Sequence, residues 1–147
     1  MSRDYSIKII LDVAATSEAI KTIVSRGQEV GIEYIDQKSD ECLTNTKKRL
    51  TLDESVRRVC LGLQSREDIE NLSVLAIKIR ETYCWLVFGK TEMHTTILLG
   101  PHAHIWMKNS AKKKIDFDKY IRLLLDLCQD FCIVELKTLD SDRDGYA

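Results

Sequence analysis

The chain has 147 residues, of which 44% are hydrophobic and 31% are charged, and its 22 Lys and Arg are set against 23 Asp and Glu. This length favours a single domain, since domains most often contain about 100–150 residues, and we expect one globular domain over residues 1–147. The apolar fraction and mixed charge exclude an intrinsically disordered chain. The net charge of -1 removes the simplest argument for nucleic-acid binding, which usually needs a basic surface.

The apolar stretches are short, and none approaches the roughly 20 residues that a membrane-spanning helix needs. The polar residues 1–6 carry no secretory signal. The five Cys contain no C-x-x-C spacing, and this favours reduced thiols, mostly buried. We therefore expect a cytoplasmic protein that does not associate with membranes.

The first third of the chain predicts a strand, a helix and a loop. Residues 6–13 are rich in β-branched side chains and predict a strand. Thr16 or Ser17 supplies the N-cap of a helix whose apolar residues recur at helical spacing, and Gly31 favours its end. Residues 31–35 fit either a short strand or a continuation of the helix. Residues 36–49 are charged and predict a loop.

The middle of the chain changes from helical to strand periodicity. Thr51 and Glu54 have the spacing of a capping box and open a helix that ends near Gln64, with one further helical turn expected at residues 65–68. Alternation with a period of two then predicts strands over residues 72–80, 83–88 and 91–99. A turn is expected at residues 89–90 and an interruption at residues 100–101. Residues 102–107 form either a fourth strand or a bent extension.

The last third of the chain predicts a polar connection, a helix and a strand. Asp116 caps the helix, and the spacing of Ile115 and Tyr120 is that of a hydrophobic staple. A strand is expected over residues 131–138 and a frayed tail over residues 139–147. The buried stripe of the helix is predicted as Ile121, Leu124, Leu125 and Cys128. The complete order predicts an α+β fold: a mostly antiparallel sheet of about five or six strands with three helices packed on it.

The three His residues are the first candidate site. His102 and His104 are two residues apart, so they share one face of the expected strand, and Trp106 continues the row. A metal site needs a third ligand, such as His94 or Glu92. The same spacing is typical of a row that faces solvent or a partner, which we favour. We therefore predict no metal and no other cofactor, with His94, His102 and His104 as the weak metal candidates.

The sequence carries no motif that names a reaction. Cys84 could formally pair with one of the His residues as a nucleophile, but its apolar setting favours a buried thiol. There is no P-loop, no G-x-S-x-G and no H-E-x-x-H. We predict no catalytic residues and a protein that is not an enzyme. A small metal-dependent enzyme that uses the His cluster remains an alternative.

Two basic clusters stand out against the near-neutral total. They are residues 47–49 and the run of Lys112, Lys113 and Lys114, and the C-terminal tail is acidic. Charges of both signs suit the steering of a protein partner. Neither cluster carries the interleaved aromatic residues of a nucleic-acid platform, so a nucleic-acid-associated factor is the second alternative. The predicted partner-binding residues are His102, His104, Trp106, Lys112, Lys113 and Lys114.

Two consecutive segments add a resemblance to a known group of proteins. They are I-D-F-D-K-Y-I-R-L-L-L-D-L at residues 115–127 and F-C-I-V-E-L at residues 131–136. In a small α+β chain this pairing resembles bacterial immunity proteins, which neutralise the toxins of contact-dependent or polymorphic toxin systems. The resemblance is one of overall character and carries no functional residue over. It implies stoichiometric binding of a cognate toxin and occlusion of its active surface, and the oligomeric state is left open.

Overall fold

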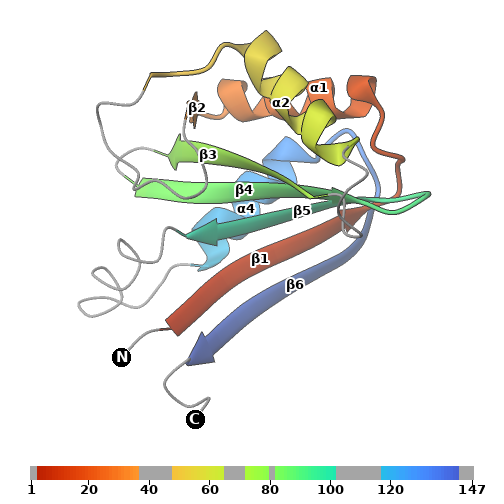
Figure 1. Ribbon diagram of the computed structural model, residues 1–147. Helices are drawn as coiled ribbons and strands as arrows, with labels where there is room; N and C mark the ends of the chain where they lie inside the picture. Colours follow the sequence, from red (N-terminus) through yellow and green to blue (C-terminus); the bar gives the residue numbers. More distant parts are fainter. Residues whose placement is uncertain (1–2, 37–47, 65–71, 80–81, 102–116, 143–147) are drawn as a thin grey trace.

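The computed structural model describes residues 3–36, 48–64, 72–79, 82–101 and 117–142. These residues form three helices and six strands, which confirms the predicted α+β fold (Figure 1). In chain order the elements are β1 (Arg3–Leu11), α1 (Ser17–Glu29), β2 (Ile32–Ile35), α2 (Leu52–Leu63), β3 (Ser73–Ile79), β4 (Thr82–Lys90), β5 (Thr95–Pro101), α4 (Phe117–Leu127) and β6 (Ile133–Asp142).

The six strands form one sheet in the order β2-β3-β4-β5-β1-β6, and every neighbouring pair is antiparallel. The N-terminal strand β1 therefore lies between β5 and β6, which come from the second half of the chain. β2 and β6 form the two edges of the sheet. This arrangement leaves two edge strands of unequal length, four residues in β2 and ten in β6.

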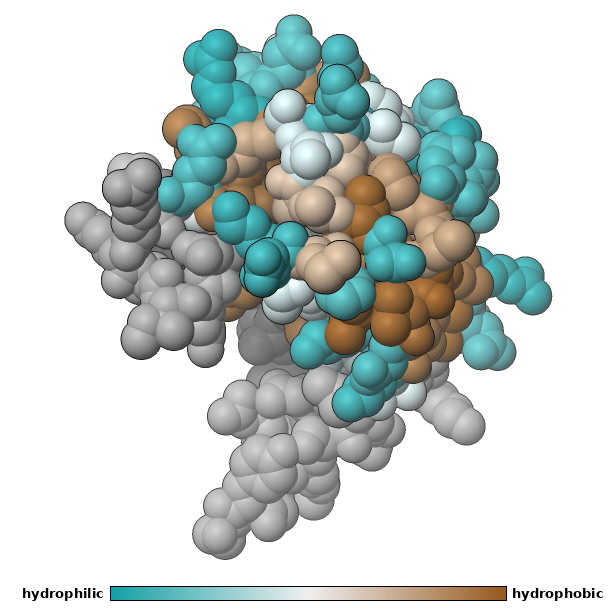
Figure 2. Space-filling model, turned by 90° about the vertical axis from the view of Figure 1, so that its right-hand side faces the viewer, coloured by the Kyte–Doolittle hydropathy of each residue, from teal (hydrophilic) through white to brown (hydrophobic). Residues whose placement is uncertain are grey.

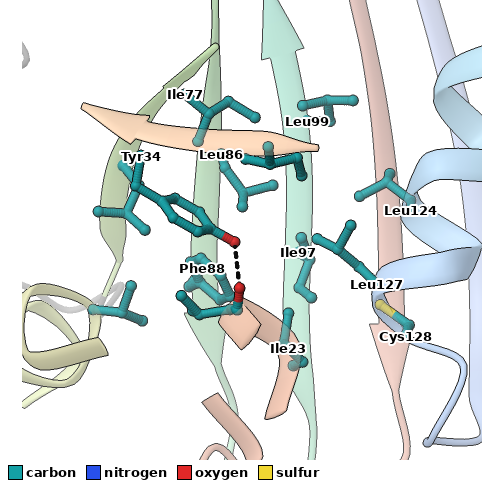
Figure 3. Close-up of a cluster of buried hydrophobic side chains, with 14 of the residues drawn as sticks. Ile23, Tyr34, Ile77, Leu86, Phe88, Ile97, Leu99, Leu124, Leu127 and Cys128 are labelled. Carbon is teal, nitrogen blue, oxygen red and sulfur yellow. Dashed lines mark hydrogen bonds between the residues drawn. The ribbon is translucent and has the colours of Figure 1, made fainter. Parts of the chain in front are cut away.

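The core lies between one face of the sheet and the three helices. In β1, Ile7, Ile9 and Leu11 are almost completely buried, and the residues between them face the other way, as a pleated strand requires. From the helices, Ile23 and Leu124 join the same cluster. Figure 3 labels Ile23 and Leu124 among the side chains that converge from the strands and the helices, and it shows α4 over the β1 and β6 side of the sheet. The helices therefore cover this face of the sheet and shield its side chains from solvent.

Tyr34 of β2 carries a buried hydroxyl group, which explains a glycine inside α1. Its hydroxyl donates a hydrogen bond of 2.9 Å to the carbonyl oxygen of Val24 (Figure 3). A Cβ at Gly27 would overlap that hydroxyl oxygen. A glycine in a helix costs about 1 kcal/mol relative to alanine, so the close approach of Tyr34 accounts for its presence. Burial also raises the pKa of Tyr34 well above its ordinary value.

The helix starts follow the sequence closely. Thr16 caps α1 by accepting from the backbone N–H of Ala19, and Thr51 and Glu54 form both hydrogen bonds of the predicted capping box of α2. Residues 31–35 resolve as strand β2, because Gly31 has a φ of 98° and ends the helix there. The capping hydrogen bonds thus begin both helices where the sequence predicts.

The hairpin between β4 and β5 differs from the prediction. The expected turn at residues 89–90 is wrong, because β4 continues to Lys90 and the turn spans Thr91 to His94, closed by a 3.0 Å hydrogen bond from the Thr91 N–H to the His94 carbonyl. The expected interruption at residues 100–101 is also wrong: Gly100 pairs with Trp85 and Pro101 with Cys84. Proline is tolerated here because it stands at the end of the strand.

Two expectations near the C-terminus are also wrong. Leu125 was predicted to be buried but is 39% exposed, because α4 turns Leu124, Leu127 and Cys128 toward the core. The frayed tail was expected from residue 139, but β6 continues to Asp142, which pairs with Arg3. These residues are polar, and a strand at the edge of a sheet tolerates polar side chains.

Candidate functional site

The six residues predicted to bind a partner lie outside the described residues. They are His102, His104, Trp106, Lys112, Lys113 and Lys114, and they stay predictions. The expected fourth strand at residues 102–107, the helical turn at residues 65–68 and the residues Asp116 and Ile115 of the helix start fall outside them as well. The candidate site lies on the surface of the described residues.

His94, the one described member of the His cluster, lies in the turn between β4 and β5. Its Nε2 is 3.8 Å from a carboxylate oxygen of Asp12, which follows β1. Glu92 is exposed in the same turn. Within the described ranges no group of three or more His, Cys, Asp and Glu is placed to hold a metal ion. His94 thus has an acidic neighbour here, and the proposed metal ligands His102 and His104 stay untested.

The four cysteines in the described ranges form no disulfide, and their exposure differs. Cys84 and Cys128 are fully buried, Cys60 is half-buried and Cys132 is exposed. Burial raises the pKa of Cys128 to about 12 and also raises that of Cys60, so both stay protonated at neutral pH. Cys84 lies opposite Pro101, at the far end of β4 from the turn that holds His94. These two residues therefore do not form a nucleophilic pair.

A cleft lies along α4, between this helix and the residues Val30 and Ile79. Its volume is about 570 Å³, in the range of binding pockets. The end of α1 and the end of β3 close it on the sides away from α4. Its lining combines apolar and charged side chains: Val30, Ile79, Tyr120, Leu123, Asp118, Lys119, Arg122 and Asp126.

The charges of the cleft follow from the spacing of α4. Asp118, Arg122 and Asp126 are four residues apart, so they lie on one side of the helix with the cation between two carboxylates. All three are exposed, and Lys119 adds a second cation beside them. The half-buried Tyr120 and Leu123 turn inward to the core. The result is an apolar floor with a rim that carries both signs of charge.

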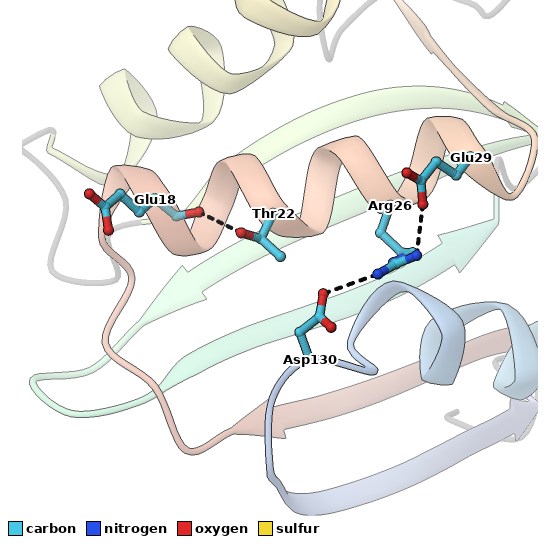
Figure 4. Close-up of polar contacts among 5 residues, drawn as sticks. All are labelled: Glu18, Thr22, Arg26, Glu29 and Asp130. Atoms are coloured by element: carbon cyan, nitrogen blue, oxygen red, sulfur yellow. Dashed lines mark hydrogen bonds and ion pairs between the residues drawn. The ribbon is translucent and has the colours of Figure 1, made fainter.

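A cluster of ion pairs joins the last turn of α1 to the segment after α4. Arg26 donates to Glu29 at 2.8 Å and to Asp130 at 3.3 Å (Figure 4). Thr22 of the same helix donates to the Glu18 carbonyl at 3.0 Å. Because Val30 follows Arg26 by one turn, this ion-pair cluster lies beside the cleft. It links α1 to the segment after α4 at the protein surface.

Sequence reasoning did not find this cleft. Its walls come from three elements that are far apart in the chain, and their proximity depends on the strand order. One signal was available: the i, i+4 series of Asp118, Arg122 and Asp126 marks a charged helix face next to the buried stripe. That signal indicates an exposed face but not a concave one.

Comparison with known proteins gives one partial similarity. A segment of the chain is 30% identical over 108 residues to Cytochrome P450 71A21 of Arabidopsis thaliana, and this is 71% of the chain but 20% of that protein. The chain thus spans about a fifth of that protein's length. No family model matches the chain, and no solved structure matches it. Within the described residues, no helix is long and apolar enough to cross a membrane.

Proposed function

We propose that the chain is a non-catalytic protein-binding module, and specifically an immunity protein that neutralises a cognate toxin by stoichiometric binding and occlusion. The observation that supports it is the cleft along α4. Specific protein interfaces combine a desolvated apolar centre with a polar rim. The cleft offers that combination through Leu123 and Ile79 at its floor and Arg122 between two carboxylates at its rim.

The charges of the rim favour a protein over the two alternatives. A nucleic acid presents phosphates, which the carboxylates of Asp118 and Asp126 would repel. Catalysis in the cleft would have to use its Asp, Lys or Tyr side chains, since the described lining contains no Ser, Thr, Cys or His, and Asp118, Lys119 and Asp126 are exposed to solvent. A protein partner with an apolar anchor and side chains of both charges fits all the lining groups.

The assignment to toxin neutralisation comes from the resemblance of residues 115–136 to immunity proteins. Those residues include α4, which supplies most of the cleft. Because the resemblance is one of overall character, the placement of the toxin contact on α4 depends on the cleft alone. The lysines at 112–114 just precede this segment in the chain. Their predicted role in steering a partner is compatible with binding at the cleft.

The test is co-expression with the toxin domain encoded by the neighbouring gene. We expect protection of growth and a complex with one copy of each chain in size-exclusion chromatography. Arg122→Glu should slow association about tenfold, because charges at an interface act mainly on the association rate. Arg57→Glu on α2 is the matched control: Arg57 is also exposed and is also four residues from an aspartate, Asp53.

Two outcomes separate the parts of the proposal. Absence of both protection and complex would show that the immunity function is wrong. A complex whose association rate is equal for Arg122→Glu and Arg57→Glu would keep the function but remove the cleft from the interface. The joint replacement of Lys112, Lys113 and Lys114 by Ser then tests the second surface, since loss of steering cations should also slow association.

A further inference from the structure

Strand β6 presents a long edge that no described strand covers. It pairs with β1 along one side over residues Arg3 to Leu11, and it is the last strand of the sheet on the other side. Ile133 is 39% exposed and Val134 55% exposed at its start. Figure 2 looks at the end of the molecule where β6 begins and shows apolar side chains gathered on that surface. Such an edge is a template for pairing with another strand.

Two charged residues of β6 lie on the face of the sheet away from the helices. Glu135 and Lys137 are two residues apart, 40% and 64% exposed, and their side chains form an ion pair of 2.9 Å. Across the ladder, Lys137 is directly opposite Lys8 of β1. Like charges directly opposite each other destabilise a sheet. Glu135 thus pairs with Lys137 along β6, and Lys8 places a second cation next to Lys137 across the ladder, while the other carboxylates of the strand, Asp140 and Asp142, come later in its sequence.

We propose that a second copy of this chain pairs with β6 in antiparallel orientation, with Leu136 opposite Leu136 of the second copy. In this register Glu135 lies opposite Lys137 of the second copy, and Lys137 opposite its Glu135. Each Lys137 then has a carboxylate opposite it on the outer side as well as Lys8 on the inner side. The charges of Glu135 and Lys137 are thus complementary to themselves about Leu136, as a two-fold symmetric interface requires.

The neighbouring registers do not have this property. A shift of two residues one way places Glu135 opposite Glu135 of the second copy, and a shift the other way places Lys137 opposite itself. Both pair like charges directly across the new ladder, which is unfavourable. Only the register centred on Leu136 pairs opposite charges while keeping the helices of both copies on the same face. The charges therefore select both the partner and the alignment.

The apolar residues near the edge fit the same arrangement. Leu136 is opposite Ile9, so it lies on the helix-covered face, where it packs partly against the core. Pairing about Leu136 brings the Leu136 side chains of the two copies opposite each other and joins the two sheets into one continuous sheet. The backbone N–H and C=O groups on the outer side of each β6 then form hydrogen bonds with the second copy.

This inference is independent of the toxin-binding proposal. The cleft is lined by α1, α4 and the end of β3, whereas the edge involves the outer side of β6. Self-association can therefore be measured on the chain alone, without a toxin. Either proposal can fail while the other stands.

The experiment is sedimentation velocity of the chain over a wide range of concentration. We expect the wild-type chain to reach twice its mass of 16.9 kDa. Glu135→Lys and Lys137→Glu should each raise the dissociation constant about tenfold or more, because each places like charges opposite each other twice in the dimer. An equimolar mixture of the two variants should form a heterodimer, and the double variant should dimerise again. Circular dichroism of each variant checks that it is folded.

Glu92→Lys, in the exposed turn after β4, is the matched control and should dimerise like the wild type, since it makes the same charge change away from the edge. A wild-type chain that stays monomeric at every concentration would overturn the proposal, even if a strand from a foreign protein binds the edge. A dimer that is insensitive to Glu135→Lys, or a mixture that fails to restore it, would overturn the register.

Discussion

The two edges of the sheet are built differently. At β2 the chain covers its own edge: the segment 48–50 lies beside the strand, Arg49 bridges to Ile35, and the N–H of Leu50 donates to the Tyr34 carbonyl at 2.7 Å. Arg49 also contacts the carboxylate of Glu33 at 2.6 Å. At β6 no described segment lies alongside, although this strand is more than twice as long.

The difference indicates which edge is available to a partner. Proteins protect edge strands by shortening them, by charge or by covering them with a loop. β2 combines all three, with four residues, a glutamate that is ion-paired and a covering segment. β6 keeps a pair of opposite charges and an exposed apolar start. We infer that the chain itself covers the β2 edge, whereas a second copy of the chain covers the β6 edge.

The largest expected effect is at the closed edge. Leu50 is 3% exposed and anchors the covering segment in the core. Leu50→Ala should lower the free energy of unfolding by about 2–5 kcal/mol, the cost of a cavity at a buried leucine. The measurement is equilibrium unfolding in urea. Leu61→Ala, at a position 61% exposed on α2, is the control and should change it by less than about 0.5 kcal/mol. Equal effects would show that the segment does not anchor the β2 edge.

The next effect concerns the contact between β2 and α1. Gly27→Ala places a methyl group against the Tyr34 hydroxyl and should cost about 1–3 kcal/mol, as overpacking does. Tyr34→Phe should cost about 1 kcal/mol for the hydrogen bond to Val24. In the Tyr34→Phe background the Gly27→Ala change should cost less than half as much, because the overlapping oxygen is gone. Additive costs in this double-mutant cycle would contradict the close contact.

A smaller effect is expected where the covering segment enters α2. Thr51 accepts from the backbone N–H of Glu54 at 3.1 Å, and it directly follows Leu50. Thr51→Ala should cost about 1 kcal/mol through the lost cap. Thr51→Ser keeps the hydroxyl and is the control, with a loss of a few tenths of a kcal/mol at most. The measurement is thermal unfolding of the wild type and the two variants. Equal melting temperatures for the wild type and Thr51→Ala would show that the cap does not stabilise the fold.

The pH dependence isolates the other half of the capping box. The backbone N–H of Thr51 donates to the Glu54 carboxylate at 3.0 Å, and hydrogen bonds from Thr51 lower the pKa of Glu54. A lowered pKa in the folded state contributes stability above the unfolded-state pKa, and this contribution is lost as the pH falls through the folded-state value. Glu54→Gln should therefore lose less stability than the wild type between neutral and acidic pH. An equal loss would mean that this hydrogen bond does not favour the charged form.

Local signals predicted the elements that local interactions determine. The caps at Thr16 and Thr51 place both helix starts, and the period of two places β3 and β4 within a few residues. Strand order was beyond such signals, because the insertion of β1 between β5 and β6 joins segments from opposite ends of the chain. The polar end of β6 has no hydrophobic alternation and becomes a strand because β1 offers a partner.

The candidate surfaces were missed for the same reason. The cleft requires α1, α4 and β3 to meet, and the significance of Glu135 and Lys137 requires knowing that β6 is an edge. The exposed Leu125 differs by one residue from the buried Leu124, a distinction that depends on how α4 is rotated over the sheet. Sequence reasoning identified the row of His102, His104 and Trp106 and the lysines at 112–114 as the binding surface, and these residues stay predictions.

The smallest expected effect tests the like-charge pair of Lys8 and Lys137 beside the open edge. Lys8→Glu replaces the like-charge pair with Lys137 by an opposite-charge pair, which should raise the free energy of unfolding by about 0.2–1 kcal/mol. It should also weaken self-association, because Lys137 then has a carboxylate on each side within its own chain. Lys8→Met, which removes the charge alone, should act in the same direction on stability and by less. If Lys8→Glu left dimerisation unchanged, the cation of Lys137 would not be what attracts the second copy, and the backbone and Leu136 contacts alone would have to hold the edge.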